Sequence, residues 1–194
     1  MNKSIVTLAI VGACIPAAAF AQDAAPATTL GGLRVEARAT YETPTVSSIV
    51  EDDDVYKLGS AFAFGGEIGY DAPLGDWTVG PYAQYEFSTV ENCDGSDCLS
   101  VKNYLEAGLS VGYSVAASGL VYGKIGYGEM TLEATDGTDT VSDGIGGVAF
   151  ALGYEQGFGN NFYGRVEGGY ADLGQYYGIN MQRRHAGVAL GMRF

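Results

Sequence analysis

The chain has 194 residues, a length typical of one domain, and a formal net charge of −13 at pH 7. Nucleic-acid binding relies on basic surfaces, so this acidic balance argues against a nucleic-acid partner. Hydrophobic residues make up 47% of the chain, with 14 Tyr and 8 Phe, a composition too apolar for a disordered acidic protein.

The first residues have the pattern of an export signal. Lys3 is the only charged residue before residue 23, and an apolar run from Ile5 to Ile15 follows it. Ala19–Ala21 then fits the A-x-A rule for cleavage, and the run is shorter than the ~20 residues of a membrane-spanning helix. We predict a signal peptide over residues 1–21. Val11–Cys14 leaves an alternative open, because it resembles a lipobox whose cysteine would be lipidated.

After a short lead-in over residues 22–30, expected to lie in the periplasm, the sequence alternates between large apolar residues and polar or small ones. A period of two is typical of β-strands. Each alternating segment is compatible with the roughly 9 to 11 residues of a tilted membrane strand. The segments are eight in number: 33–41, 62–70, 77–87, 99–115, 121–127, 147–155, 162–170 and 185–194.

The gaps between these segments alternate in length. Long gaps at 42–57, 90–98, 133–143 and 172–181 alternate with short ones at 71–76, 116–119 and 156–161. Long extracellular loops and short periplasmic turns give this pattern in outer-membrane barrels. We therefore predict an all-β fold, an eight-stranded antiparallel up-and-down transmembrane β-barrel over residues 31–194. An even strand number places both termini in the periplasm.

The two faces of the strands suggest which side meets lipid. The apolar face carries aromatic residues near the strand ends, as in interfacial girdles. The other face is largely Gly, Ala, Ser and Tyr with charges of both signs, which suits a crowded lumen where buried charges must pair. A soluble barrel with this face in water is the alternative. The predicted lumen charge network comprises Arg34, Glu36, Arg38, Glu67, Glu86, Lys102, Glu106, Lys124, Glu155, Arg165, Glu167, His185 and Arg193.

The predicted loops hold two further features. Cys93 and Cys98 flank a turn-forming stretch, and in an oxidising compartment this spacing favours a disulfide over two free thiols. The loops are also acidic, and clustered carboxylates can bind Ca²⁺. The alternative is solvated loops that bind no metal. The calcium candidates are Asp52, Asp53, Asp54, Asp136 and Asp139.

The chain ends in Phe194, with apolar residues at alternate positions before it. This ending resembles the signal read by the outer-membrane barrel assembly machinery. The run Leu152–Gly174 resembles the penultimate hairpin of OmpA-type and opacity-type barrel domains. The resemblance covers residues 31–194 and implies a Gram-negative outer-membrane location, among lipid and lipopolysaccharide, as a monomer. No peptidoglycan-binding domain follows the barrel, so we do not expect cell-wall anchoring.

The sequence is less specific about activity. Some similar barrels modify lipid A with a catalytic His, but His185, the only histidine, falls on the predicted lumen face, away from lipid. Glycines on that face leave room for a small-solute leak channel. We expect no enzyme and no cofactor. The interpretation we favour is a structural or surface-interaction protein with a filled lumen and acidic extracellular loops that contact an extracellular ligand. A leak channel and a lipid-modifying enzyme are the alternatives.

Overall fold

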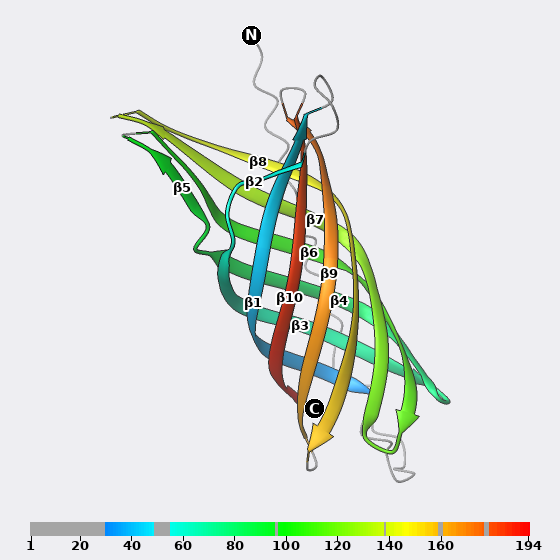
Figure 1. Ribbon diagram of the computed structural model, residues 1–194. Coiled ribbons are helices and arrows are strands. Elements are labelled where there is room, and N and C mark those ends of the chain that lie inside the picture. Colours follow the sequence, from blue (N-terminus) through cyan, green and yellow to red (C-terminus); the bar gives the residue numbers. More distant parts are fainter. Residues whose placement is uncertain (1–29, 49–54, 96, 138, 159–160, 177–178) are drawn as a thin grey trace, which may run out of the picture.

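The computed structural model describes residues 30–48, 55–95, 97–137, 139–158, 161–176 and 179–194 (Figure 1). The predicted signal peptide, residues 22–29 of the lead-in, and Asp52, Asp53 and Asp54 lie outside the described residues. Within the described ranges, no helix is long and apolar enough to cross a membrane. The strands are β1 (Gly32–Ser48), β2 (Val55–Lys57), β3 (Ala61–Leu74), β4 (Trp77–Ser88), β5 (Glu91–Asp94), β6 (Asp97–Ala116), β7 (Gly119–Asp136), β8 (Asp139–Phe158), β9 (Phe162–Tyr176) and β10 (Ile179–Arg193).

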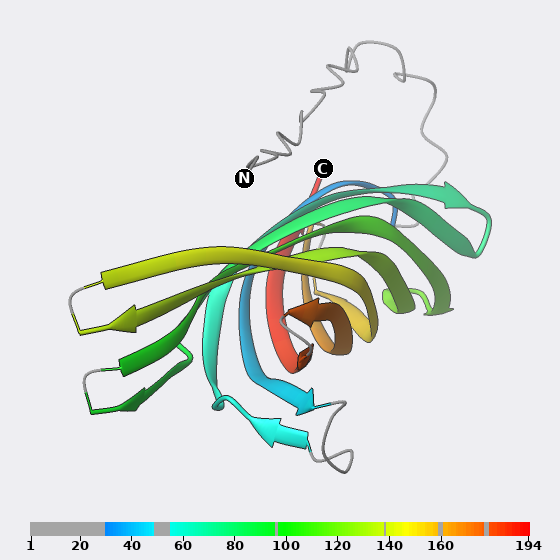
Figure 2. The same ribbon diagram turned by 90° about the horizontal axis from the view of Figure 1, so that it is seen from above.

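Eight of these strands form a closed antiparallel barrel. Each long strand pairs with the next long strand along the chain, in the order β1, β3, β4, β6, β7, β8, β9 and β10. The ring closes because β1 also pairs with β10, from Arg34 opposite Arg193 to Ser48 opposite Ile179 (Figures 1 and 2). The short strands β2 and β5 add to β1 and β6 at one end. The predicted fold class is confirmed.

The barrel has its apolar side chains outside and its charges inside. Leu152 and Leu190 are 73% and 69% exposed, whereas Arg34 and Glu86 are fully buried. Aromatic residues lie near both ends of the outer surface, as the contacts between Trp77 and Tyr113 (4.8 Å between ring centroids) and between Tyr41 and Phe62 (5.4 Å) illustrate. This arrangement suits hydrocarbon and contradicts the alternative of a soluble barrel with its polar face in water.

The two ends of the barrel differ. At what we call the terminal end, Gly32 and Phe194 lie close together, and a tight turn joins β3 to β4. At the opposite, hairpin end, the β5–β6 and β7–β8 hairpins continue past the barrel wall and project to one side (Figure 2). Most of the loops predicted at 90–98 and 133–143 are therefore strands. We call the four-stranded part of residues 91–101 and 131–147 the hairpin sheet.

A β-bulge in β6 makes one lumen prediction wrong. Val101 pairs with Leu132, but Asn103 already pairs with Thr131, so Lys102 is an extra residue. A bulge of this kind reverses the inside–outside alternation beyond it. Val101 is accordingly buried. The Lys102 side chain lies outside the lumen, 45% exposed, with its Nζ 2.7 Å from Glu133 Oε1.

Candidate functional site

The lumen holds a dense network of charged side chains from all eight barrel strands. Apart from Lys102, every residue of the predicted network lies inside the barrel and is at most 9% exposed. If a continuous water-filled channel ran past these charged side chains, their exposed fractions would be larger. The observed lumen is therefore filled by side chains, as expected for eight strands.

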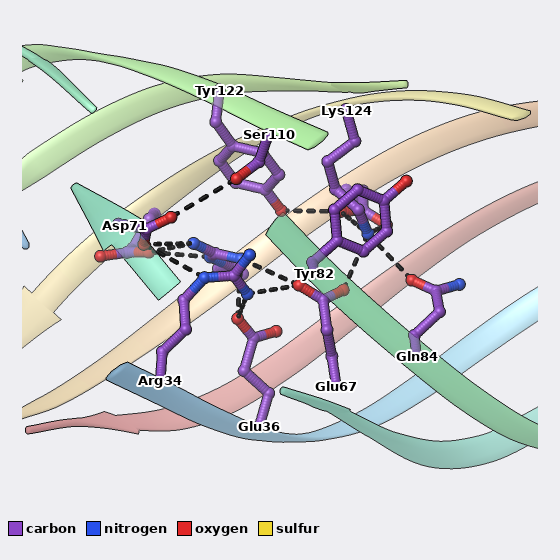
Figure 3. A network of polar contacts seen from close by, with 12 residues as sticks. Arg34, Glu36, Glu67, Asp71, Tyr82, Gln84, Ser110, Tyr122 and Lys124 are labelled. Atoms are coloured by element: carbon purple, nitrogen blue, oxygen red, sulfur yellow. Dashed lines mark hydrogen bonds and ion pairs between the residues drawn. The ribbon is translucent and has the colours of Figure 1, made fainter. Parts of the chain in front are cut away.

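Glu67 on β3 lies at the centre of this network (Figure 3). Its carboxylate accepts a hydrogen bond from Arg34 Nη1, and it lies 3.1 Å from Arg38 Nη1 and 2.8 Å from Lys124 Nζ. Lys124 also donates to Gln84 Oε1 at 2.9 Å. Arg165 Nη1 lies farther away, 3.6 Å from Glu67 Oε1. Four cations from three strands therefore share one fully buried carboxylate, which offsets part of the free-energy cost of removing each charge from water.

A second group of ion pairs lies toward the terminal end. Arg193 Nη2 is 2.7 Å from Asp71 Oδ2, and Arg193 Nη1 is 2.9 Å from Glu155 Oε1. Arg165 connects this group to the centre, because its Nη2 is 2.7 Å from Glu155 Oε2 and its Nη1 is 2.7 Å from Glu36 Oε1. The first and last barrel strands are thus linked through the lumen as well as through their backbones.

A third group lies toward the hairpin end. Arg183 Nε is 2.5 Å from Glu42 Oε2, and its Nη2 is 2.7 Å from Glu86 Oε2. Arg38 joins this group to the centre, because its Nε is 3.5 Å from Glu86 Oε1 and its Nη1 is 3.1 Å from Glu67 Oε2. The guanidinium of Arg183 also lies 4.0 Å from the centroid of the Tyr104 ring, a favourable cation–π distance.

Sequence reasoning missed three members of the network, Glu42, Asp71 and Arg183. We assigned Glu42 and Asp71 to gaps, and the last strand was predicted to begin only at His185. The signal was present, because each residue continues the two-residue period of the lumen face of its strand. The strands are simply longer than a membrane crossing requires, so the alternation extends past the predicted boundaries.

Tyrosine rings fill the lumen beside glycines on the neighbouring strand. Tyr122 pairs with Gly153 and Tyr163 pairs with Gly191 in the strand register. A Cβ atom at Gly153 would lie 2.4 Å from Tyr122 Cζ, and one at Gly191 would lie 2.2 Å from Tyr163 Cζ. An aromatic ring packed over a strand glycine is a known device for pinning register. These lumen glycines therefore hold tyrosine rings rather than water.

Glu106 is held differently from the other lumen carboxylates. The hydroxyl of Tyr104 donates to Glu106 Oε2 at 2.6 Å, and Tyr82 donates to Oε1. In the described part of the chain no Lys, Arg or His nitrogen forms an ion pair with Glu106. We predicted that the lumen charges neutralise one another, and the structure instead gives this carboxylate two neutral donors. Among the described buried residues, eight carboxylates accompany six Lys and Arg side chains.

Apolar residues close the lumen at both ends. Toward the hairpin end, a cluster that includes Val101, Met130, Leu132, Ile145 and Met181 lies above the charges. At the terminal end, Leu30 packs against Leu120 and Tyr122. Leu30 belongs to the predicted lead-in, so the segment just before β1 contributes to the barrel interior. We had predicted neither apolar layer from the sequence.

His185 lies on the lumen face of β10, as predicted, whereas Phe194 directly follows the last residue of β10. The His185 side chain is 3% exposed, inside the barrel, with Nε2 3.6 Å from Glu167 Oε1. Phe194 is 67% exposed, and its backbone nitrogen donates to the Leu33 carbonyl at 2.8 Å. Its role as an assembly signal stays a prediction.

The hairpin sheet contains the described loop candidates. Cys93 and Cys98 face each other across β5 and β6 and are joined as a disulfide. Asp136 and Asp139 pair across the tip of the β7–β8 hairpin, and both are exposed. The structure thus brings two of the five calcium candidates together at an exposed hairpin tip. Residues 91–101 and 131–147 contain acidic residues but no Lys, Arg or His.

Comparisons with known proteins agree with this architecture. Ail, the attachment invasion locus protein of Yersinia pestis, was solved in complex with the heparin analogue sucrose octasulfate. It superposes with a TM-score of 0.56 at 15% identity, covering 82% of this chain and 99% of Ail. The neisserial surface protein NspA gives a TM-score of 0.56 at 15% identity, covering 84% of this chain and 97% of NspA.

At these identities the likeness shows the fold alone. No curated protein sequence matches the chain significantly. The model of the outer membrane protein beta-barrel domain matches residues 5–194, which is nearly the whole chain. The chain therefore belongs to the outer membrane protein beta-barrel domain family.

Proposed function

We propose that this outer-membrane protein is a non-enzymatic barrel that interacts with other molecules through its hairpin sheet. The proposal places the hairpin end outside the cell and both termini in the periplasm. One observation carries it: a sheet with acidic tips continues from the barrel wall past a lumen that side chains fill. Backbone hydrogen bonding keeps this sheet ordered beyond the wall, which makes it a preformed surface.

The filled lumen argues against the small-solute channel. Its charged groups are at most 9% exposed, and apolar clusters lie both above and below them. An ion crossing this lumen would have to displace paired buried charges, each costing several kcal/mol. We therefore expect the protein to show no stable open state in planar bilayers. A large sustained conductance would instead support the function of a small-solute channel.

The enzyme alternative depends on His185. A general base needs a substrate within hydrogen-bond reach, and this imidazole lies inside the barrel beside Glu167, away from the lipid-facing surface. We therefore assign His185 to interior packing.

The charge of the hairpin sheet indicates the kind of partner. Ail was solved in complex with a sulfated sugar analogue, but the hairpin sheet of this chain is acidic and would repel sulfate groups. We propose a cationic partner for the hairpin sheet. Binding of a dye-labelled hexalysine peptide to the protein in nanodiscs tests this, and it should weaken as salt rises. Binding that is independent of salt, or no binding at low salt, would contradict it.

A topology experiment tests the orientation on which the proposal depends. Thr140 lies near the tip of the β7–β8 hairpin, and Asp76 lies in the short turn between β3 and β4 at the terminal end. A membrane-impermeant maleimide should label Thr140→Cys on intact cells, whereas Asp76→Cys should react only after lysis. The parent protein, whose Cys93 and Cys98 are joined, is the unlabelled control. The reverse labelling pattern would overturn the proposal.

A further inference from the structure

The inner face of the hairpin sheet changes from apolar to acidic along its length. Because side chains alternate along a strand, residues in register on β6, β7 and β8 point to the same side. Toward the barrel, Val101, Leu132 and Asp143 are in register, and Leu99, Ala134 and Val141 form the next row. The outermost row is entirely acidic and consists of Asp97, Asp136 and Asp139.

An apolar pocket of about 290 Å³ lies where this face meets the mouth of the barrel. Seven apolar residues and the carboxylate-bearing Asp143 line it, with Leu99, Leu132, Val141 and Met181 among them. A 150 Å³ apolar cavity is known to hold benzene, so this pocket has room for a group of roughly twice that size, such as an alkyl chain of about eight carbons. Its lower side is the buried apolar cluster, so water gains few hydrogen bonds there.

A second hollow adjoins the first along the sheet. It has a volume of about 660 Å³ and shares Leu99, Ala134 and Val141 with the apolar pocket. Its far end is lined by Asp97, Asp136 and Asp139. The two hollows therefore form one groove, apolar at the barrel mouth and acidic at the hairpin tips.

We propose that this groove binds a small cationic amphiphile, with its apolar body at the barrel mouth and its cationic head among the acidic residues at the tips. The acidic residues at the tips would repel an anionic head, and residues 91–101 and 131–147 contain no Lys, Arg or His to attract it. A neutral apolar molecule would fill the mouth but gain no attraction from the carboxylates of Asp136 and Asp139. This inference deepens the proposed function, since it requires the hairpin sheet to be a ligand-binding surface.

Methionine methyl groups offer a direct readout of binding. Beyond the predicted signal peptide the sequence contains Met130, Met181 and Met192. Met181 lines the pocket, Met130 belongs to the buried cluster below it, and Met192 lies near the other end of the barrel, in register with Val35 of β1. In ¹³C-methyl NMR spectra, the protein in nanodiscs should thus report pocket occupancy at Met181, while Met192 reports on probe dissolved in the lipid.

The experiment titrates octyltrimethylammonium, octanol and octyl sulfate, which share a chain and differ in the charge of the head. We expect octyltrimethylammonium to shift Met181 saturably, at least roughly tenfold more tightly than the other two probes, with Met192 unchanged. Equal affinity for all three probes would overturn the assignment of the acidic end. Parallel, unsaturating shifts at Met181 and Met192 would show lipid partitioning only and overturn the site.

Two variants test the two halves of the groove. Ala134→Phe should fill the apolar part and weaken binding of octyltrimethylammonium by at least roughly tenfold, while Thr140→Phe, on the opposite face of the same hairpin, should leave it unchanged. The double change Asp136→Asn and Asp139→Asn should lower affinity for the cation but not for octanol. Unchanged affinity in Ala134→Phe would refute the proposal. Nanodiscs expose both ends of the barrel, so these titrations do not depend on the orientation of the protein in cells. A reversed orientation in cells would therefore contradict the proposed function but leave the titrations unaffected.

Discussion

Replacing Glu67 by Gln should strongly destabilise the barrel. Glu67 is fully buried and forms ion pairs with four cations, and Gln keeps its shape while removing its charge. The cations are Arg34, Arg38, Lys124 and Arg165. Breaking a buried ion pair costs about 3–5 kcal/mol because a charge is left uncompensated. Arg34 and Arg165 retain Glu36, and Lys124 and Arg38 retain Glu167. We therefore expect a loss of about 3 kcal/mol in the free energy of unfolding, the lower end of this range.

Glu106→Gln is the matched control. Glu106 is equally buried but accepts hydrogen bonds from two tyrosine hydroxyls instead of forming an ion pair with a described cation. An amide can keep one of these bonds, and its NH₂ group can donate to the other hydroxyl. We expect a change within about 1 kcal/mol, the net value of one neutral hydrogen bond.

Urea unfolding in lipid vesicles measures both changes. Trp77, the only tryptophan, lies 52% exposed on the outer surface and reports unfolding by fluorescence. Glu67→Gln should lower the midpoint without altering the slope, whereas Glu106→Gln should leave the midpoint nearly in place. Equal losses in the two variants would refute the argument that charge pairing, rather than filling of space, holds the lumen together.

Three further predictions use the same assay. Lys102→Met should cost less than about 1 kcal/mol, because its ion pair is exposed, and a larger loss would place this side chain in the lumen after all. Gly153→Ala should cost about 1–3 kcal/mol by overpacking a tyrosine, whereas at Gly123 a Cβ meets nothing closer than 3.4 Å and the same change should cost little. Leu190→Arg should lower the free energy of unfolding in lipid by about 2–4 kcal/mol. Val141 is similarly exposed but lies on the hairpin sheet, so Val141→Arg should leave the free energy of unfolding almost unchanged. Equal losses in the two variants would contradict the membrane boundary drawn here.

The sequence was sufficient to predict the barrel because one physical rule governs every strand. Lipid requires apolar residues outside, and a narrow lumen requires small or paired polar residues inside. The two-residue period therefore predicts the barrel fold, and it also predicts that residues such as Glu67 and Arg165 face the lumen. Glu42 and Asp71 follow this rule too and were missed only because we expected the strands to end sooner.

Other features could not be read from the period. The bulge at Lys102 depends on how β6 pairs with β7, which is a property of two strands and not of one. The hairpin sheet was missed because acidic, turn-forming residues such as Asp136 and Asp139 are common in loops, and only pairing beyond the barrel keeps them in strands. The apolar groove depends on the same pairing, since its rows come from three separate strands.

The pairing between β1 and β10 also bears on how the protein is made. These strands lie at opposite ends of the sequence, yet they match from Arg34 with Arg193 to Ser48 with Ile179. The seam can therefore form only after translation has reached the last strand, and until then both edges offer unpaired backbone to any other strand. A chain arrested before β10 would have two unpaired strand edges that can pair with other chains. To avoid aggregation, these edges must be shielded until β1 and β10 have paired.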